Sequence, residues 1–128
     1  MSQPVHFVVA DDESASRILI ERILSKSFPG CSITHCDDGE QVLKLLERNA
    51  PALLITDFNM PYSSGARLLL ALRHRPTRVP VVVISNSDQC RMASLEAGAD
   101  FFLNKGDLFD LPRVIEQLIP GEVLRSSP

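Results

Sequence analysis

Charged and hydroxyl side chains stand at the ends of several short apolar runs in this sequence. These residues are Asp11, Asp12, Asp57, Ser85 and Lys105. Three carboxylates brought close together repel one another unless a cation is bound. A hard divalent ion with oxygen ligands, Mg²⁺ above all, suits such a set. The sequence therefore indicates a metal-dependent site, provided that the fold gathers these residues.

The same residue types suit phosphoryl transfer. The metal and the Lys105 ammonium would neutralise the oxygens of an arriving phosphoryl group, and the Ser85 hydroxyl would supply a neutral donor. An aspartate can itself be the nucleophile and form an acyl phosphate. We expect Asp57 to take this role, because it stands alone at the end of an apolar run.

Alternating elements can bring these residues together. Predicted strands cover residues 5–10, 32–36, 52–56, 79–84 and 101–103, and predicted helices cover residues 14–26, 40–49, 66–74, 89–97 and 111–119. Strands that alternate with helices predict an α/β fold, a doubly wound parallel sheet with helices on both faces. Ligands bind such sheets at the carboxyl ends of the strands, which is where the five residues lie.

Length and composition limit the class of protein. The 128 residues fit one domain over residues 1–120, with 121–128 as a C-terminal tail or the start of a linker. A net charge of −3 argues against a strongly basic nucleic-acid footprint, so we expect no direct nucleic-acid partner. No apolar run approaches the roughly 20 residues of a membrane span. Three cysteines without a C-x-x-C pair indicate reduced thiols, and we expect a cytoplasmic protein.

Four segments carry a family resemblance. They are Val9-Ala10-Asp11-Asp12, Asp57-Phe58-Asn59-Met60-Pro61 with Gly65, Val83-Ile84-Ser85, and Ala97-Gly98-Ala99-Asp100 followed by Lys105. In this order they resemble the receiver domain of two-component response regulators, the single-domain chemotaxis type included. The resemblance runs from residue 5 to residue 119. It implies a flavodoxin-like receiver fold with five parallel strands in the order 2-1-3-4-5 and five helices.

The resemblance also implies roles for single residues. Asp57 would be the phosphoacceptor, assisted by Lys105. The metal, Mg²⁺ or Mn²⁺ in its place, would be held by Asp11, Asp12, Asp57 and the backbone carbonyl of Asn59. Ser85 and Phe102 match the two switch positions of the family. Asn59 and Ser87 match positions that tune the lifetime of the phosphate.

A signalling function follows from the resemblance. The phosphoryl group would come from a histidine kinase or a histidine phosphotransfer protein. Phosphorylation would draw Ser85 inward, make space for Phe102 and change the face built from the fourth helix, fifth strand and fifth helix. A downstream protein or an output domain outside this chain would read that face. Such a protein catalyses its own phosphorylation and dephosphorylation only.

Three residues depart from the family pattern. Gly106 follows Lys105 where the family usually has proline after a cis peptide, so either this peptide is trans or Gly106 absorbs the strain. Asn86 stands where a smaller residue is usual. Phe102 lacks the hydroxyl of the more frequent tyrosine, so its switching must rest on packing. None of the three removes a residue that the chemistry requires.

Two other readings compete with a phosphorylated receiver. One is a degenerate receiver that binds proteins independently of phosphorylation; the intact Asp57, Ser85 and Lys105 argue against it. The other is a metal-dependent phosphatase with an aspartate nucleophile. Such enzymes carry D-x-D after the first strand and a cap over the substrate, whereas Asp11 and Asp12 are adjacent and 128 residues leave little length for a cap.

Overall fold

A five-stranded parallel sheet forms the centre of the protein, in a computed structural model that describes residues 4–60, 63–76 and 78–125. The strands are β1 (His6–Ala10), β2 (Ser32–Cys36), β3 (Leu53–Asp57), β6 (Val81–Ser85) and β7 (Phe101–Asn104). They lie in the order β2-β1-β3-β6-β7, which is 2-1-3-4-5 when only the strands of this sheet are numbered. The predicted fold class and strand order are therefore confirmed.

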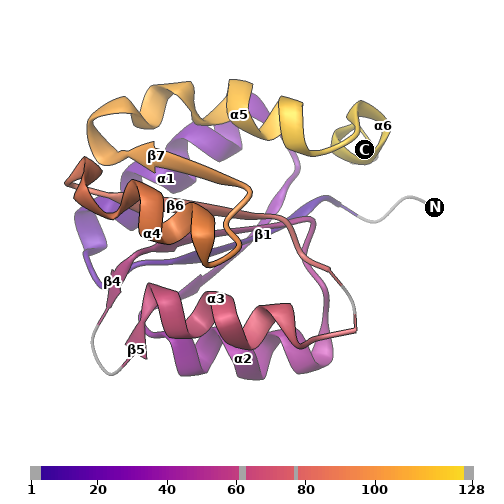
Figure 1. Cartoon of the computed structure of the whole chain (residues 1–128). Helices are drawn as coiled ribbons and strands as arrows, with labels where there is room; N and C mark the ends of the chain where they lie inside the picture. The colour runs from indigo at the N-terminus through magenta and orange to yellow at the C-terminus, as the bar shows by residue number, and fades with distance from the viewer. Residues whose placement is uncertain (1–3, 61–62, 77, 126–128) are drawn as a thin grey trace.

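Helices cover both faces of the sheet (Figure 1). The five predicted helices are found as α1 (Ser14–Ser27), α2 (Gly39–Arg48), α3 (Gly65–Arg73), α4 (Arg91–Glu96) and α5 (Leu111–Leu118). Helices α1 and α5 pack on one face, in a core that includes Ile20 and Ile115. Helices α2 and α3 pack on the other face, in a second core that includes Val42 and Leu68. Since both faces are covered, every residue of β3 and β6 is buried, which explains their unbroken apolar runs.

Four features of the structure differ from the sequence prediction. A short antiparallel hairpin, β4 (Asn59–Met60) and β5 (Ser63–Ser64), lies where a loop was expected. A 3-10 turn, Asp88–Cys90, precedes α4, and another, Lys105–Asp110, precedes α5. A sixth helix, α6 (Gly121–Leu124), follows α5 because Leu124 is buried in the core of α1 and α5. The described residues thus contain six α-helices instead of the five predicted.

Two glycines are required by their surroundings. Gly65 opens α3 so close to the hairpin that a Cβ would lie 2.7 Å from the carbonyl oxygen of Phe58. Gly98 follows α4 with φ +115°, a backbone conformation that residues with a side chain rarely adopt. Pro61 of the predicted motif and residues 126–128 of the predicted tail lie outside the described residues. A domain boundary at residue 120 stays a prediction.

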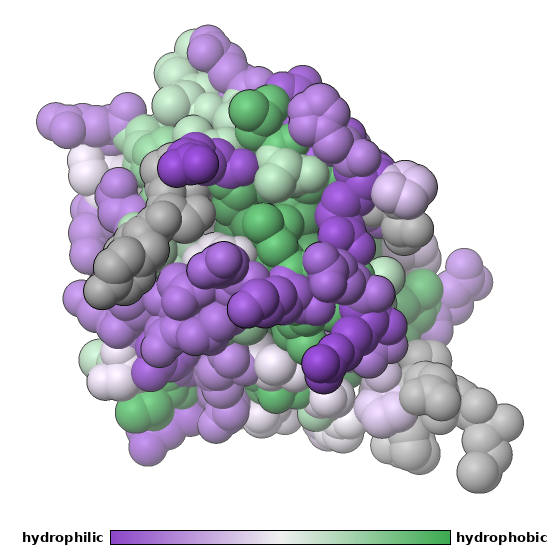
Figure 2. Space-filling view, turned by 90° about the horizontal axis from the view of Figure 1, so that it is seen from below, coloured by the Kyte–Doolittle hydropathy of each residue, from purple (hydrophilic) through white to green (hydrophobic). Residues whose placement is uncertain are grey.

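The surface is mixed in polarity. Seen from the side of α2 and α3, a hydrophobic area lies in the middle and hydrophilic residues surround it (Figure 2). Leu70 of α3 and Met92 of α4 are among the large hydrophobic side chains that are more than half exposed. Over the described ranges, no helix is both long enough and apolar enough to cross a membrane.

Candidate functional site

Three aspartates meet at the carboxyl ends of two neighbouring strands. Asp11 directly follows β1 and Asp57 ends β3, and these strands are paired so that Ala10 lies beside Thr56. One carboxylate oxygen from each of Asp11, Asp12 and Asp57 lies within 4.8 Å of the others. Asp11 and Asp57 are buried and Asp12 is exposed. We call these three residues the aspartate cluster; its formation matches the expectation from the strand ends.

Lys105, the residue after β7, contacts two members of the aspartate cluster. Its Nζ lies 2.8 Å from Oδ2 of Asp57, 2.9 Å from Oδ2 of Asp11 and 2.9 Å from Oε1 of Glu13. The side chain of Lys105 is only 6% exposed. Burial disfavours its charge, but the hydrogen bonds to Asp57, Asp11 and Glu13 outweigh that effect and raise the pKa of Lys105. The ammonium is therefore fixed in its charged form beside the proposed nucleophile.

The two buried aspartates are oriented in the same way. Oδ1 of Asp11 accepts a hydrogen bond of 2.8 Å from the backbone N–H of Glu13, and Oδ1 of Asp57 accepts one of 3.0 Å from the backbone N–H of Asn59. In each case Oδ2 faces Lys105. Burial is the main reason that the pKa of Asp11 is raised, and the hydrogen bonds from Glu13 and Lys105 oppose it. Both carboxylates are thus held in position before any ligand arrives.

The aspartate cluster fits a hard divalent cation. Carboxylate oxygens are the ligands that Mg²⁺ prefers in proteins. One oxygen from each of the three aspartates lies within 4.8 Å of the others, so small side-chain movements would bring all three to one ion. Asp12 is exposed, so its side chain is free to move toward the other two. One ammonium against three carboxylates also leaves an excess of negative charge that a cation would relieve.

Ser85 lies on the neighbouring strand at the same edge. It ends β6, whose residue Ile84 is paired with Asp57, and it is itself paired with Asn104, the residue before Lys105. The side chain is buried, and its Oγ accepts a hydrogen bond of 3.2 Å from the backbone N–H of Ser87. Ser85 is therefore placed between the strand of Asp57 and the strand of Lys105.

Phe102 lies inward in this structure. It is 2% exposed and belongs to the core of α2 and α3. The guanidinium carbon of Arg91 lies 4.7 Å from the centre of its ring, a cation–π contact. Arg91 also pairs with Asp88 at 3.4 Å, and Asp88 accepts a hydrogen bond of 3.0 Å from the side chain of Asn104. The ring is thus covered by a polar chain that joins α4 to the end of β7.

The peptide between Lys105 and Gly106 is trans, since the described residues contain no cis peptide bond. The backbone N–H of Gly106 donates a hydrogen bond of 2.8 Å to the Asn104 side chain, which starts the 3-10 turn after β7. Of the two possibilities for this peptide, a trans bond or a strain absorbed by Gly106, the trans bond is found. Asn86, the second departure from the family pattern, is exposed.

Two site residues were missed by the sequence reasoning. Glu13 contacts Lys105, and its Oε1 also accepts a hydrogen bond of 2.7 Å from the Ser16 hydroxyl. The signal was present, because Glu13 continues the acidic run of Asp11 and Asp12. Arg91 gave a weaker signal, since only its spacing of three residues from Asp88 indicated a contact.

The sequence matches the family described as the response regulator receiver domain over residues 7–117. The chain is similar to the response regulator MprA of Mycobacterium sp. (strain KMS), with 34% identity over 118 residues that make up 91% of this chain and 48% of that protein. It is similar to the transcriptional regulatory protein PrrA of Mycobacterium tuberculosis, with 36% identity over 114 residues, 88% of this chain and 46% of that protein. The chain spans about half the length of these curated relatives.

A solved structure shares the fold. The receiver domain of the sensor histidine kinase PA1611 from Pseudomonas aeruginosa PAO1 superimposes with a TM-score of 0.82 at 21% identity, over 91% of this chain and 98% of that one. That crystal structure holds a magnesium ion in its active-site cleft. Together with the family match and the geometry at the strand ends, these similarities show that the chain belongs to the response regulator receiver domains of two-component signalling.

Proposed function

We propose that Asp57 is the phosphoacceptor of this receiver domain, and that the donor is the phosphohistidine of a histidine kinase or of a histidine phosphotransfer protein. Receiver domains of response regulators accept phosphoryl groups in general. The observation that carries the assignment to Asp57 is its contact with Lys105. The Oδ2 atom of Asp57 lies 2.8 Å from the Lys105 ammonium, at the edge of the sheet where Asp11 and Asp12 also lie.

In the proposed reaction a carboxylate oxygen of Asp57 attacks phosphorus as the bond from phosphorus to the donor imidazole nitrogen breaks. The bonding electrons leave with the imidazole, and an acyl phosphate forms on Asp57. Lys105 is already charged and in place, so it stabilises the phosphoryl oxygens with little reorganisation. The hydrogen bond from the Asn59 backbone N–H holds Asp57 in its orientation for attack.

Asp11, Asp12 and Asp57, with the backbone carbonyl of Asn59, are the residues that would hold Mg²⁺ or, in its place, Mn²⁺. When bound, the ion supplies positive charge against the phosphoryl oxygens. The Asp11 carboxylate would stay directed at the site because the Glu13 backbone N–H holds its other oxygen. Asn59 comes two residues after Asp57, and Ser87 comes two residues after Ser85. We assign to these two residues the tuning of the phosphate lifetime.

We assign the output to the face formed by α4, β7 and α5, which is the fourth helix, fifth sheet strand and fifth helix of the receiver fold. An acyl phosphate on Asp57 would draw the Ser85 hydroxyl inward, and Phe102 would repack behind it. Met92 and Leu95 support this assignment, because these large apolar side chains of α4 are 66% and 43% exposed. A downstream protein or an output domain would cover them.

The length of the relatives supports an output domain outside this sequence. The chain spans 48% of MprA and 46% of PrrA of M. tuberculosis. We propose that residues 1–120 form the receiver and that residues 121–128, of which Gly121–Leu124 form α6 against its core, are a tail or the start of a linker. We further propose that the protein works in the cytoplasm, and that its only catalysis is its own phosphorylation and dephosphorylation.

Replacement of the phosphoacceptor tests the proposal. We expect the unmodified chain to gain one phosphoryl group from acetyl phosphate with Mg²⁺, measured by intact mass, and hydroxylamine to release it as from an acyl phosphate. Asp57→Asn should abolish the gain while the circular dichroism spectrum stays unchanged. Asp107→Asn, an exposed aspartate outside the aspartate cluster, is the matched control and should be modified normally.

Equal modification of the Asp57→Asn variant would place the phosphoryl group on another residue. If the unmodified chain accepts no phosphoryl group from acetyl phosphate or from a kinase, the protein is instead a degenerate receiver that binds its partners independently of phosphorylation.

A further inference from the structure

A concave site lies at the opposite end of the sheet from the aspartate cluster. Its volume is about 260 Å³, and it is formed where α3 ends, β6 begins and α4 turns into β7. Three arginines line it: Arg73, Arg75 and Arg78. We call it the arginine pocket. It shares no residue with the aspartate cluster, because β6 starts at this end of the sheet and reaches the phosphorylation site only at Ser85.

The charge of the arginine pocket is opposite to that of the whole chain. Its lining holds three guanidinium groups against one carboxylate, that of Asp100, whereas the chain carries a net charge of −3. Asp100 is already engaged, because Oδ2 accepts a hydrogen bond of 2.8 Å from the Val81 backbone N–H and Oδ1 pairs with Arg78. Its side chain is 15% exposed, while that of Arg78 is 77% exposed. The carboxylate therefore holds Arg78 in place and leaves donors of its guanidinium free toward solvent.

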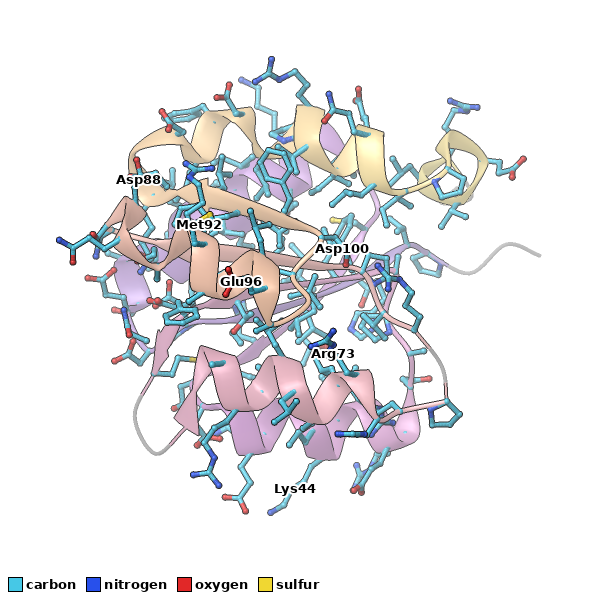
Figure 3. All side chains as sticks on the ribbon, in the orientation of Figure 1. Lys44, Arg73, Asp88, Met92, Glu96 and Asp100 are labelled. Atoms are coloured by element: carbon cyan, nitrogen blue, oxygen red, sulfur yellow. The ribbon has the colours of Figure 1, made fainter. Side chains whose placement is uncertain are left out.

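Arg73 is the arginine that the fold leaves available. Arg75 donates a hydrogen bond of 2.7 Å to the carbonyl of Leu46 near the end of α2, which is a structural role. Within the part of the chain that the structure describes, the side chain of Arg73 forms no hydrogen bond or ion pair. Its side chain rises from α3 toward the end of α4 (Figure 3), where a Cβ on Gly98 would lie 3.2 Å from its Cδ. The absence of a side chain at Gly98 thus leaves the space that Arg73 occupies.

The floor of the arginine pocket is apolar. It is formed by side chains of α3 and of the start of β6, namely Leu69, Leu72, Val79 and Val81. Leu69 and Val81 are buried, at 1% and 3% exposure, so this floor is part of the folded core. A site with an apolar floor and a rim of guanidinium groups complements a ligand with one apolar part and one anionic part. Guanidinium groups bind phosphate oxygens through paired hydrogen bonds, which favours a phosphate as the anionic part.

We infer that the arginine pocket binds a small organic phosphate. Arg73 and Arg78 hold the phosphate group, and the organic part lies on the apolar floor. The volume of about 260 Å³ limits the ligand to a phosphate monoester of modest size. The inference does not depend on the assignment of Asp57, since the two sites lie at opposite ends of the strands.

Nuclear magnetic resonance tests the inference on the full chain. The ¹⁵N-labelled protein is titrated with phenyl phosphate and, separately, with inorganic phosphate, without divalent ions so that the aspartate cluster repels both probes. We expect saturable shifts of the amides of Arg73, Val79, Gly98 and Asp100. Phenyl phosphate should bind several-fold more tightly than inorganic phosphate because only the former covers the apolar floor.

Two variants of equal charge distinguish binding at the arginine pocket from general electrostatic attraction of the phosphate to the protein. Arg73→Gln should weaken the binding of phenyl phosphate about tenfold, because a charge-assisted pair of hydrogen bonds is lost. Arg22→Gln changes the charge equally at an exposed position on α1, on the other face of the sheet, and should leave the affinity unchanged. Equal affinities of the two variants would overturn the inference, as would shifts spread over the surface. Equal affinities for the two probes would overturn the role of the apolar floor.

Discussion

Glu13 and Lys105, which are 92 residues apart in the sequence, are joined by an ion pair of 2.9 Å beside the aspartate cluster. Lys105 is therefore shared among three carboxylates. Two belong to the aspartate cluster, and the third belongs to Glu13, which is not one of the proposed metal ligands. The hydrogen bond from Ser16, followed by that from Lys105, lowers the pKa of Glu13. Glu13 thus adds a fixed negative charge where an anionic phosphodonor must approach.

Removal of that charge should speed phosphorylation by a small donor. A unit charge about 6 Å from an anion contributes about 0.7 kcal/mol of repulsion in water, which corresponds to roughly a threefold change in rate. We expect Glu13→Gln to be phosphorylated by acetyl phosphate about threefold faster than the unmodified chain, measured by the intact mass over time. Glu47→Gln, at an exposed position of α2, is the control of equal charge. A rate at or below that of the control would show that Glu13 instead helps by holding Lys105.

The charge of Asp12 should destabilise the folded state when no metal is bound, and it should increase the stabilisation that Mg²⁺ provides. Asp12 is exposed and adds a third carboxylate to Asp11 and Asp57. Two unit charges about 5 Å apart in water repel by about 0.8 kcal/mol, and Lys105 offsets part of this repulsion. We expect Asp12→Asn to raise the free energy of unfolding by about 0.5–1 kcal/mol without divalent ions, measured with urea.

Addition of Mg²⁺ should make the unmodified chain more stable than the Asp12→Asn variant. An ion that binds only the folded state stabilises it by mass action, so the unmodified chain should gain more stability than the Asp12→Asn variant at equal Mg²⁺. Asp107→Asn should respond like the unmodified chain, because it lies outside the aspartate cluster. Identical Mg²⁺ responses of all three proteins would rule out Asp12 as a ligand.

The contact between Arg91 and Phe102 can be isolated by a matched pair of variants. Arg91 and Arg113 each form an ion pair with an aspartate three residues earlier, at 3.4 and 3.6 Å. Of these two arginines, Arg91 also lies over an aromatic ring, that of Phe102. We expect Arg91→Ala to lose about 0.5–1 kcal/mol more unfolding free energy than Arg113→Ala, since the ion pairs are equivalent and the cation–π contact is not. Equal losses would show that Phe102 is held by packing alone.

His6 should make stability depend on pH in mildly acidic solution. Burial lowers the pKa of His6 from its ordinary value of 6.5, and its ring nitrogen Nε2 lies 2.9 Å from the Thr34 hydroxyl. As pH falls through 6.5, the unfolded chain takes up a proton first, so the contribution of His6 to stability is lost. Below the lowered pKa of the folded state this loss stops growing.

A comparison with His6→Gln tests this dependence, because the other titrating groups are common to both proteins. The difference in unfolding free energy between the unmodified chain and the variant should fall from about pH 7.5 to about pH 5.5. A difference that is constant across this range would show that His6 has the same pKa in both states.

The sequence predicted the strand ends well because a parallel sheet leaves few choices. A buried strand covered on both faces is an apolar run, and its end is marked by the first polar residue. Asp57 at the end of β3 and Ser85 at the end of β6 were found in this way. The crossover connections then place all these ends at one edge of the sheet. The gathering of the aspartate cluster followed from topology alone.

Side-chain partners could not be predicted in the same way. Whether Lys105 contacts Glu13 as well as Asp57 depends on the conformation of two flexible side chains that come from distant parts of the sequence. The helix α6 was missed because Pro120 and Gly121 favour the end of a helix, while the burial of Leu124 is a tertiary effect. Local patterns predict elements; packing decides which weak elements form.

The central place of β1 has a consequence for biosynthesis. This strand is made first, yet it lies between β2 and β3, and its residue Phe7 is paired with both Ile33 and Leu53. Until Leu53 has left the ribosome, one edge of a strand that is apolar from Phe7 to Ala10 has no neighbour. Such delayed pairing slows folding and exposes the strand to aggregation. A nascent chain stalled before β3 should therefore depend on chaperones more than the finished protein does.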